Sequence, residues 1–396
     1  MNLHEALALA VEKIEIGSFA DAELICNAIL DLYPEDKPTL LIKSLVGGAS
    51  GAEILGTPGE KSLLNFFKKY HSHYGAIPDY NLNWAIKDFD PIHEFLGSNP
   101  LILIDVGARG ASLGEVENLK KYCCYYGFDA DASECKRVNE NPPKDFHQLK
   151  MLPYYIGKLD GDRVDFNLYK ARGQSSRFLP SEKFIKLFDP MEVENTVSLK
   201  STTLDTILGN EGIEAFDFIK LDTQGTELEI LSGSPKTLGK ALLVEAEIEF
   251  CEMYNGQPLF GEFFSFMMEK GFDLLYINRV FQNRVAYNRP SRGQITFCDA
   301  LFARRDEDYS GYDHVSLAKH AILLINYGHL DIAHEIWAGF KSVKDMLPNL
   351  GNYFKEYPSD SNRYLNMSRD KLIAWALHQR KNNQLPFDSD RSWPFR

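Results

Sequence analysis

Several features are absent from this 396-residue sequence, and each absence excludes a class of protein. No stretch approaches the roughly 18 uninterrupted apolar residues of a membrane-spanning helix. The N-terminus carries no basic leader ahead of its short apolar segment, so we expect a cytoplasmic protein. The formal net charge of −13 argues against nucleic acid as a partner, because phosphate backbones are bound by clustered lysine and arginine.

Cysteine is scarce as well. The six cysteines include no pair with the spacing of a zinc knuckle or a thioredoxin-like redox site. We expect them to be reduced, and we expect Cys123 and Cys124, which lie in an apolar run, to fill the core.

What the sequence does have is 44% hydrophobic and 25% charged residues, the composition of a globular protein. Its length allows one large α/β domain with helical additions, or two to three units.

Periodicity divides the chain into four parts. We predict a helical hairpin region at 1–60, connecting or docking helices at 61–100, a strand-and-helix domain at 101–305 and a helical region at 306–396. Both helical ends contain a glycine followed at the fifth position by alanine, in the segments that begin at Gly17 and Gly328. This spacing resembles a tetratricopeptide hairpin, but one unit at each end is too few for a solenoid.

The helical ends therefore have two interpretations. In the first, the hairpins only pack on the central domain. In the second, they bind a protein partner or mediate self-association.

The central part alternates strands with helices. Short apolar runs at 101–106, 122–128, 216–221 and 241–244 are typical of buried parallel strands. Three helices are expected to begin with capping boxes: Ser112 with Glu115, Asp131 with Glu134, and Thr226 with Glu229. Right-handed crossovers then give a doubly wound, mostly parallel α/β sheet, whose ligand crevice lies beyond the carboxyl ends of the strands.

A glycine-containing turn follows the first predicted strand. It lacks the G-x-G-x-x-G pattern of dinucleotide sites, which disfavours a nucleotide-sugar oxidoreductase. An acid just before the glycines suits a phosphate-free ligand that carries an amino group, such as S-adenosylmethionine (SAM). The alternative is an ordinary strand-to-helix turn. The cofactor contacts expected here are Asp105, Gly107, Ala108, Arg109 and Gly110.

Acids also end the second and fourth predicted strands. Asp129 follows Asp105 by 24 positions, the place from which an acid can bind the hydroxyls of a ribose, and Ala130 lies beside it. Asp222 ends the strand before Gly225 and faces the same crevice. We expect Asp222 to contact either the cofactor or the attacking group of the acceptor.

The segment 217–227, which reads Asp-Phe-Ile-Lys-Leu-Asp-Thr-Gln-Gly-Thr-Glu, resembles the hallmark of the FkbM family of SAM-dependent methyltransferases. Further similar segments are 173–176, 203–205, 247–250, 254–260, 271–272 and 299–302. The resemblance implies a class I methyltransferase (Rossmann-like) fold with SAM as donor, and O-methylation of a hydroxyl on a sugar, glycan or other small molecule. Arg109 and Ala111 depart from the usual glycine-rich loop.

An alcohol acceptor must lose its proton, and a nearby carboxylate can take it. Asp222 is the first candidate base and Glu247 the second. Long segments at 169–197 and 252–258 are typical of functional lids. The acceptor contacts expected are Arg172, Gln174, Ser175, Ser176, Gln224, Glu252 and Tyr254. Arg172 and Arg177 are either a clamp for an anionic group or ordinary surface arginines.

A divalent metal is not indicated, although some relatives use one. Glu245, Glu247 and Glu249 alternate along a strand and, with Asp222, offer oxygen ligands. They are equally consistent with solvated or salt-bridged acids on one face of a strand. The alternative function is an interaction protein with tetratricopeptide-like ends and a non-catalytic methyltransferase fold.

Overall fold

The computed structural model describes residues 90–111, 113–188, 191–286 and 293–356, together with 10, 13, 19–32 and 43. The chain forms two compact units, one of 1–78, 290–292 and 355–396, and one of 79–289 and 293–354. In the first unit, α2 (Phe19–Leu32) buries Ala22, Cys26 and Ile29 on one side. Gly17, Ser112 and residues 61–89 of the predicted docking region 61–100 lie outside the described residues.

The second unit is built on a seven-stranded sheet of order β3-β2-β1-β7-β8-β10-β9. The strands are β1 (Leu101–Val106), β2 (Cys123–Phe128), β3 (Gln148–Leu152), β7 (Phe218–Leu221), β8 (Leu243–Glu249), β9 (Phe272–Gln282) and β10 (Gln294–Arg304). The first five in this order run parallel, and β10 is antiparallel to both its neighbours. This confirms the predicted doubly wound, mostly parallel sheet of the class I methyltransferase type.

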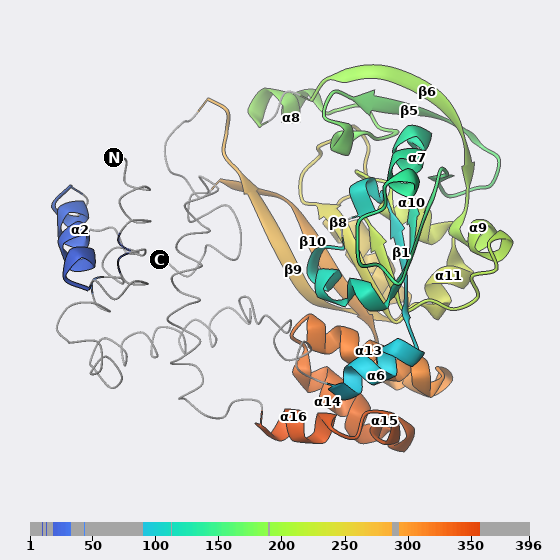
Figure 1. The fold of residues 1–396 in the computed structure, drawn as a ribbon. Coiled ribbons are helices and arrows are strands. Elements are labelled where there is room, and N and C mark those ends of the chain that lie inside the picture. The colour runs from blue at the N-terminus through green and yellow to red at the C-terminus, as the bar shows by residue number, and fades with distance from the viewer. Residues whose placement is uncertain are drawn as a thin grey trace. The chain divides into compact units, whose positions relative to one another are not determined.

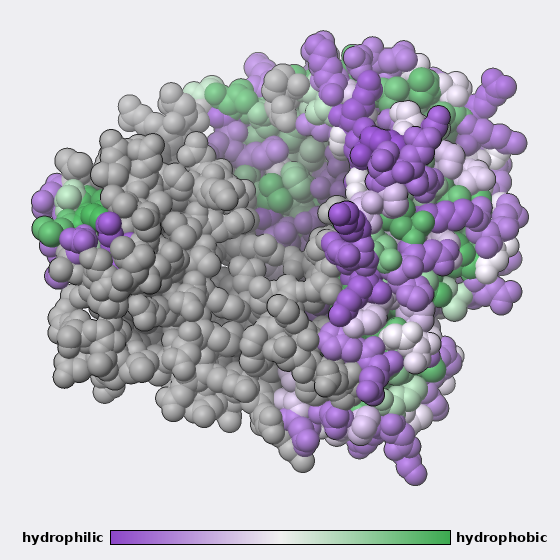
Figure 2. Space-filling model, viewed as in Figure 1, coloured by the Kyte–Doolittle hydropathy of each residue, from purple (hydrophilic) through white to green (hydrophobic). Residues whose placement is uncertain are grey.

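Two hydrophobic cores cover the sheet. One joins β1 and β2 to α6 (Asp90–Ser98), α7 (Ala132–Glu140), α13 (His314–Asn326), α14 (Leu330–Gly339), α15 (Lys341–Met346) and the start of α16 (Leu350–Glu356). The other joins β1, β7 and β8 to α9 (Leu204–Asn210), α10 (Glu227–Ser232), α11 (Pro235–Lys240) and α12 (Phe260–Glu269). Hydrophilic side chains dominate the visible surface of this unit, because the apolar ones face the cores (Figure 2).

The six cysteines are free, which agrees with the reduced state expected from the sequence. Cys123 is fully buried as predicted, while Cys124 is only half-buried. In the part of the chain that the structure describes, no helix has both the length and the apolar character needed to cross a bilayer.

A smaller sheet of order β4-β6-β5 lies beyond the carboxyl ends of the parallel strands (Figure 1). It consists of β4 (Tyr155–Ile156), β5 (Arg163–Tyr169) and β6 (Val193–Thr202). The short helices η3 (Arg172–Gln174) and α8 (Glu182–Leu187) lie between β5 and β6, and α8 carries part of a third hydrophobic cluster. We call residues 153–202 the cap. The predicted loop at 169–197 is therefore an ordered layer, because its own aromatic side chains give it a core.

The C-terminal helices gather at the amino ends of the parallel strands (Figure 1). Lys319 of α13 donates a 3.0 Å hydrogen bond to Asp217, which precedes β7. The same carboxylate oxygen accepts a 2.7 Å bond from the backbone N–H of Ile102. All three belong to the second unit, so this buried ion pair ties the helical tail to two central strands.

We expect Lys319→Met to destabilise the second unit by about 3 kcal/mol, because it leaves the Asp217 carboxylate buried without its cation. Urea unfolding measures the change. Lys341→Met, at an exposed position on α15, is the matched control and should stay within about 0.5 kcal/mol of the unaltered chain. Equal effects of the two changes would show that the ion pair does not join tail and sheet.

Candidate functional site

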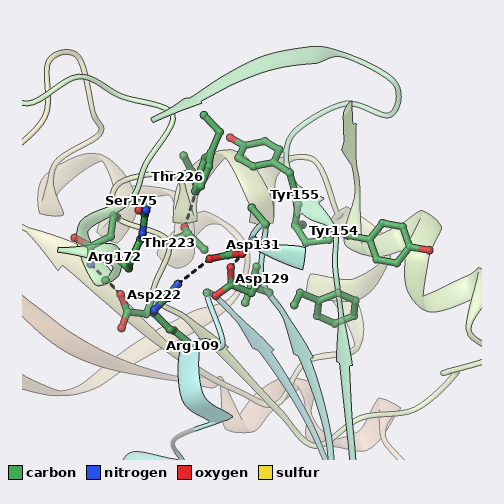
Figure 3. A pocket seen from close by; sticks show the side chains of 18 of the residues that line it. Arg109, Asp129, Asp131, Tyr154, Tyr155, Arg172, Ser175, Asp222, Thr223 and Thr226 are labelled. Atoms are coloured by element: carbon green, nitrogen blue, oxygen red, sulfur yellow. Dashed lines mark hydrogen bonds and ion pairs between the residues drawn. The ribbon is translucent and has the colours of Figure 1, made fainter. Parts of the chain in front are cut away.

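A cavity opens where the strand order reverses between β1 and β7, the place where open α/β sheets bind ligands. The ends of β1, β2 and β7 form one side of its wall and the cap forms the other (Figure 3). The predicted site residues that line it are Gly107, Arg109, Asp129, Ala130, Arg172, Ser175, Asp222 and Gln224.

Gly107 makes the turn after β1 possible. Its φ is +85°, and a Cβ added there would lie 1.8 Å from the backbone oxygen of Asp222. The backbone N–H of Gly107 donates to Phe128 at the end of β2 (2.9 Å), and the N–H of Asp222 donates to Val106 (2.9 Å). Three strand ends are thereby held together by main-chain contacts that only glycine permits.

Asp105 lies beneath this turn and does not line the cavity. It is 3% exposed, and Tyr125 donates a 2.5 Å hydrogen bond to its Oδ2. Burial raises the pKa of Asp105, while Lys220 and Tyr125 act in the opposite direction. Its Oδ1 is buried without a hydrogen-bond partner among the described residues. Only the Oδ1 atom of Asp105 is therefore left for the contact with a cofactor that the sequence predicts.

Ala108 and Gly110 do not line the cavity, since Ala108 is buried beside it and Gly110 is exposed to solvent. The N–H of Gly110 donates to Glu134 at 3.0 Å. Arg109 does reach the cavity, where its guanidinium lies 3.5 Å from Asp131 (Figure 3).

The helix after β2 begins largely as predicted. Asp131 is the N-cap of α7 and accepts from the N–H groups of Ser133 and Glu134. The reciprocal half of the predicted capping box is wrong, because the Glu134 carboxylate is bonded to Gly110 and Arg137 instead.

Asp129 lines the cavity, where the sequence places a ribose contact. Its Oδ1 accepts a 2.7 Å bond from the N–H of Asp131. Burial raises the pKa of Asp129 to about 6, although the Asp131 N–H and Arg109 oppose the shift. The group is therefore ionised at neutral pH and protonated in mild acid.

The loop after β7 carries Asp222, Thr223, Gln224 and Thr226 into the cavity wall. Glu227 holds this loop in place, because its carboxylate accepts from the Thr223 N–H (2.7 Å) and the Thr223 hydroxyl (2.9 Å). Burial raises the pKa of Glu227 to about 7. Sequence reasoning missed Glu227, although an acid in the first turn of a helix is its signal.

The predicted capping box at Thr226 and Glu229 is wrong. The Thr226 side chain does not cap α10 and instead donates to the Thr223 hydroxyl (2.8 Å). Glu229 pairs with Arg177 of the cap. The backbone of Thr226 (φ −105°, ψ 5°) lies outside the extended region that is typical of a capping residue. Glu227 accepts instead from the N–H groups of Thr223 and Gly225, in the loop before this helix.

Lys220 lies largely buried in β7, with its Nζ 3.7 Å from Oδ2 of Asp222. Burial lowers the pKa of Lys220, but Asp105, Asp222, Glu245 and Asp299 outweigh it and raise the pKa. The sequence signal for this cation, which we did not use, is a single lysine within an otherwise apolar strand.

The acids of β8 are not the solvated row that one interpretation proposed. Glu245 and Glu249 are 9% and 1% exposed, and Glu247 is half-buried. Glu247 lies behind Gln224 and does not line the cavity. Burial, followed by Asp222 and Glu249, raises the pKa of Glu247 well above its usual range. Among the described residues, no group of three or more His, Cys, Asp or Glu side chains is arranged to hold a metal ion.

The predicted acceptor residues divide into two groups. Arg172 and Ser175 line the cavity beside Asp222 (Figure 3), and Arg172 is also paired with Glu194. Arg177 lies outside the cavity wall, paired with Glu229, so the predicted clamp of two arginines is not formed.

Four further predicted contacts are not part of the cavity wall: Gln174, Ser176, Glu252 and Tyr254. Ser176 and Tyr254 are fully buried, and their hydroxyls bond within the protein. Glu252 accepts from the N–H of Gly256 (3.0 Å). Ser176 and Tyr254 therefore lie behind the wall, whereas Glu252 is exposed outside it.

Residues 111–274 match the family model described as the methyltransferase FkbM domain. This part of the chain is a methyltransferase FkbM domain. A curated relative, 2-O-methyltransferase NoeI of Sinorhizobium fredii (strain NBRC 101917 / NGR234), is 24% identical over 167 residues, which cover 39% of this chain and 66% of NoeI. The resemblance predicted from the sequence is confirmed.

Two solved structures of magnesium protoporphyrin IX methyltransferase (ChlM) from Synechocystis PCC 6803, one with bound SAM and one with bound SAH, are similar to 71% of this chain at 10% identity. The matches cover 97% and 100% of those chains, with a TM-score of 0.29 in each case. The fold assignment therefore rests on the sheet topology of this chain.

The FkbM domain also lines its cavity with residues that the sequence did not single out. Tyr154 and Tyr155 contribute from the cap, on the side away from Asp222 (Figure 3), and Phe128 and Ile156 add apolar surface. The available signal is a pair of aromatic residues in the connection after β3. The cavity thus combines an apolar, aromatic side with an acidic one.

We expect Gly107→Ala to destabilise the FkbM domain by about 2 to 4 kcal/mol, because the methyl group meets rigid backbone and the left-handed φ is strained. Urea unfolding gives the value. Gly97→Ala is the control, since nothing lies within 4 Å of a Cβ added there. A loss at Gly107 no larger than at Gly97 would mean that the two strand ends can separate freely.

Proposed function

We propose that this chain transfers a methyl group from SAM to a hydroxyl of a sugar, glycan or other small molecule. The observation that carries the proposal is the convergence of Gly107, Asp129 and Asp222 on one cavity of an FkbM domain. The name of the relative NoeI, a 2-O-methyltransferase, supports an oxygen acceptor.

The residues present fit SAM. The Asp129 carboxylate is placed to accept from ribose hydroxyls, and the apolar surface of Phe128 and Ile156 suits the base. The unpartnered Oδ1 of Asp105 suits the cofactor's amino group, reached directly or through a water. When bound, SAM supplies a methyl group activated by a positively charged sulfur.

Asp222 is the proposed base that takes the proton of the acceptor hydroxyl. Its Oδ1 accepts a 3.0 Å bond from Gln224, and its Oδ2 lies near Lys220, so its carboxylate has a fixed orientation at the cavity wall. Glu247, the second candidate, is separated from the cavity by Gln224. Arg172 and Ser175 are the proposed acceptor contacts, because they line the cavity on the cap side.

Asp222→Asn keeps the shape of the side chain but removes its ability to take a proton. We expect kcat to fall by about 10²-fold or more while the affinity for SAM stays within a few-fold. Calorimetry measures SAM binding, and a methyl-transfer assay against a panel of glycans and small alcohols measures turnover. Asp165→Asn, at an exposed position on β5, is the matched control. Equal loss of affinity and turnover would make Asp222 a cofactor ligand instead.

Binding of SAM should depend on pH through Asp129. The carboxylate accepts from ribose hydroxyls when ionised, so affinity should be full above pH 7 and should fall as the pH drops through about 6. Calorimetric titration at pH 5.5 and pH 7.5 tests this, with an expected weakening of roughly fourfold at the lower pH, because the ionised fraction of a group with a pKa of about 6 falls by that factor. Asp129→Asn should bind more weakly at both values and lose the difference. A pH dependence that survives in the variant would place the titrating group elsewhere.

A further inference from the structure

We propose that Gln224 is a positioning residue that couples the cap to the orientation of Asp222. The inference deepens the proposed function and rests on it. It assigns Gln224 a role within the protein, in place of the acceptor contact expected from the sequence.

Both polar atoms of the Gln224 side chain are already hydrogen-bonded within the protein. Its Nε2 donates to Oδ1 of Asp222 (3.0 Å) and to Oε1 of Glu247 (2.5 Å), which uses both amide hydrogens. Its Oε1 accepts from the hydroxyl of Tyr254 (2.8 Å). This arrangement also fixes the amide orientation, because the nitrogen faces two carboxyl groups and the oxygen faces a hydroxyl.

The backbone of Gln224 is fixed as well as its side chain. Its φ of +59° lies in the left-handed region, which is strained for a residue other than glycine. The hydroxyl of Ser176, in the cap, donates a 2.7 Å bond to the backbone oxygen of Gln224. A strained residue persists where its surroundings determine its conformation, and here side chain and backbone are both fixed.

The contacts of Gln224 connect two parts of the domain. Ser176 belongs to the cap, and the Tyr254 hydroxyl also lies 2.9 Å from the backbone oxygen of Gln174 in the cap. Tyr254 further pairs with Pro180 in an isolated β-bridge. On the other side of Gln224, Asp222 directly follows β7 and Glu247 lies on β8. A displacement of the cap on acceptor binding therefore reaches Asp222 through a single amide group.

The charges agree with this role. Burial, followed by Asp222 and Glu249, raises the pKa of Glu247 well above its usual range. The amide of Gln224 lies between Glu247 and Asp222, so that one N–H donates to Glu247 and the other is directed at Asp222. Loss of this N–H would leave the candidate base free to rotate away from the acceptor.

The test is a double-mutant cycle. Gln224→Met keeps the length of the side chain and removes both N–H donors. We expect kcat to fall about 30-fold or more, with KM for the acceptor and Kd for SAM within threefold. In the Asp222→Asn background the same change should lower kcat by less than threefold, because Gln224 acts through Asp222.

Tyr254→Phe removes only the hydroxyl that holds Oε1 of Gln224, and it preserves packing if Gln224→Met fails to fold. It should lower kcat several-fold in the unaltered chain and have no effect when Gln224 is already Met. Gln148→Met, at an exposed position on β3, is the matched control. Multiplicative losses in both cycles would overturn the coupling while leaving methyl transfer intact. Absence of SAM binding by the unaltered chain would instead overturn the proposed function, and the coupling with it.

Discussion

The close approach of two backbone segments, the turn after β1 and the end of β7, is the constraint on which the site depends. No side chain fits between Gly107 and the carbonyl of Asp222. The same turn bonds to Phe128, so the end of β2 is fixed as well. Because these strands flank the point where the sheet order reverses, their loops diverge above it and leave a crevice. The positions of Asp129 and Asp222 follow from main-chain geometry before any ligand binds.

Buried negative charge is the second constraint. A single cation, the ammonium group of Lys220, compensates most of the acids near the end of β7. A carboxylate removed from water is costly unless a charge or hydrogen bonds compensate it. Lys220 provides that compensation for the acids around the end of β7, and its own raised pKa records their effect. Glu247 is bonded to an amide and has a strongly raised pKa. One edge of the sheet therefore holds carboxyl groups in different environments, with Lys220 beside Asp222 and the Gln224 amide bonded to Glu247.

Local patterns explain what the sequence predicts well. Short apolar runs mark β1, β2 and β7, and the first polar residues after them must emerge at the carboxyl edge, so Gly107, Asp129 and Asp222 are found without a structure. The failures involve distant partners. Ser176 and Gln224 are 48 positions apart, and Tyr254 and Gln224 are 30 apart. Nothing local distinguishes a serine that binds an acceptor from one that supports a loop. The burial of the acids on β8 was not predicted for the same reason, since their partners lie on other strands.

The two sides of the cavity differ in how far their polar groups are already satisfied. On the sheet side, Glu227 and Gln224 use nearly all of their hydrogen-bonding capacity to hold the loop that carries Asp222. On the cap side, Nη1 of Arg172 is buried without a hydrogen-bond partner among the described residues. A group that is unsatisfied without ligand gains most from a complementary one. The cap side therefore keeps free hydrogen-bonding capacity at the cavity, while the sheet side has a fixed geometry.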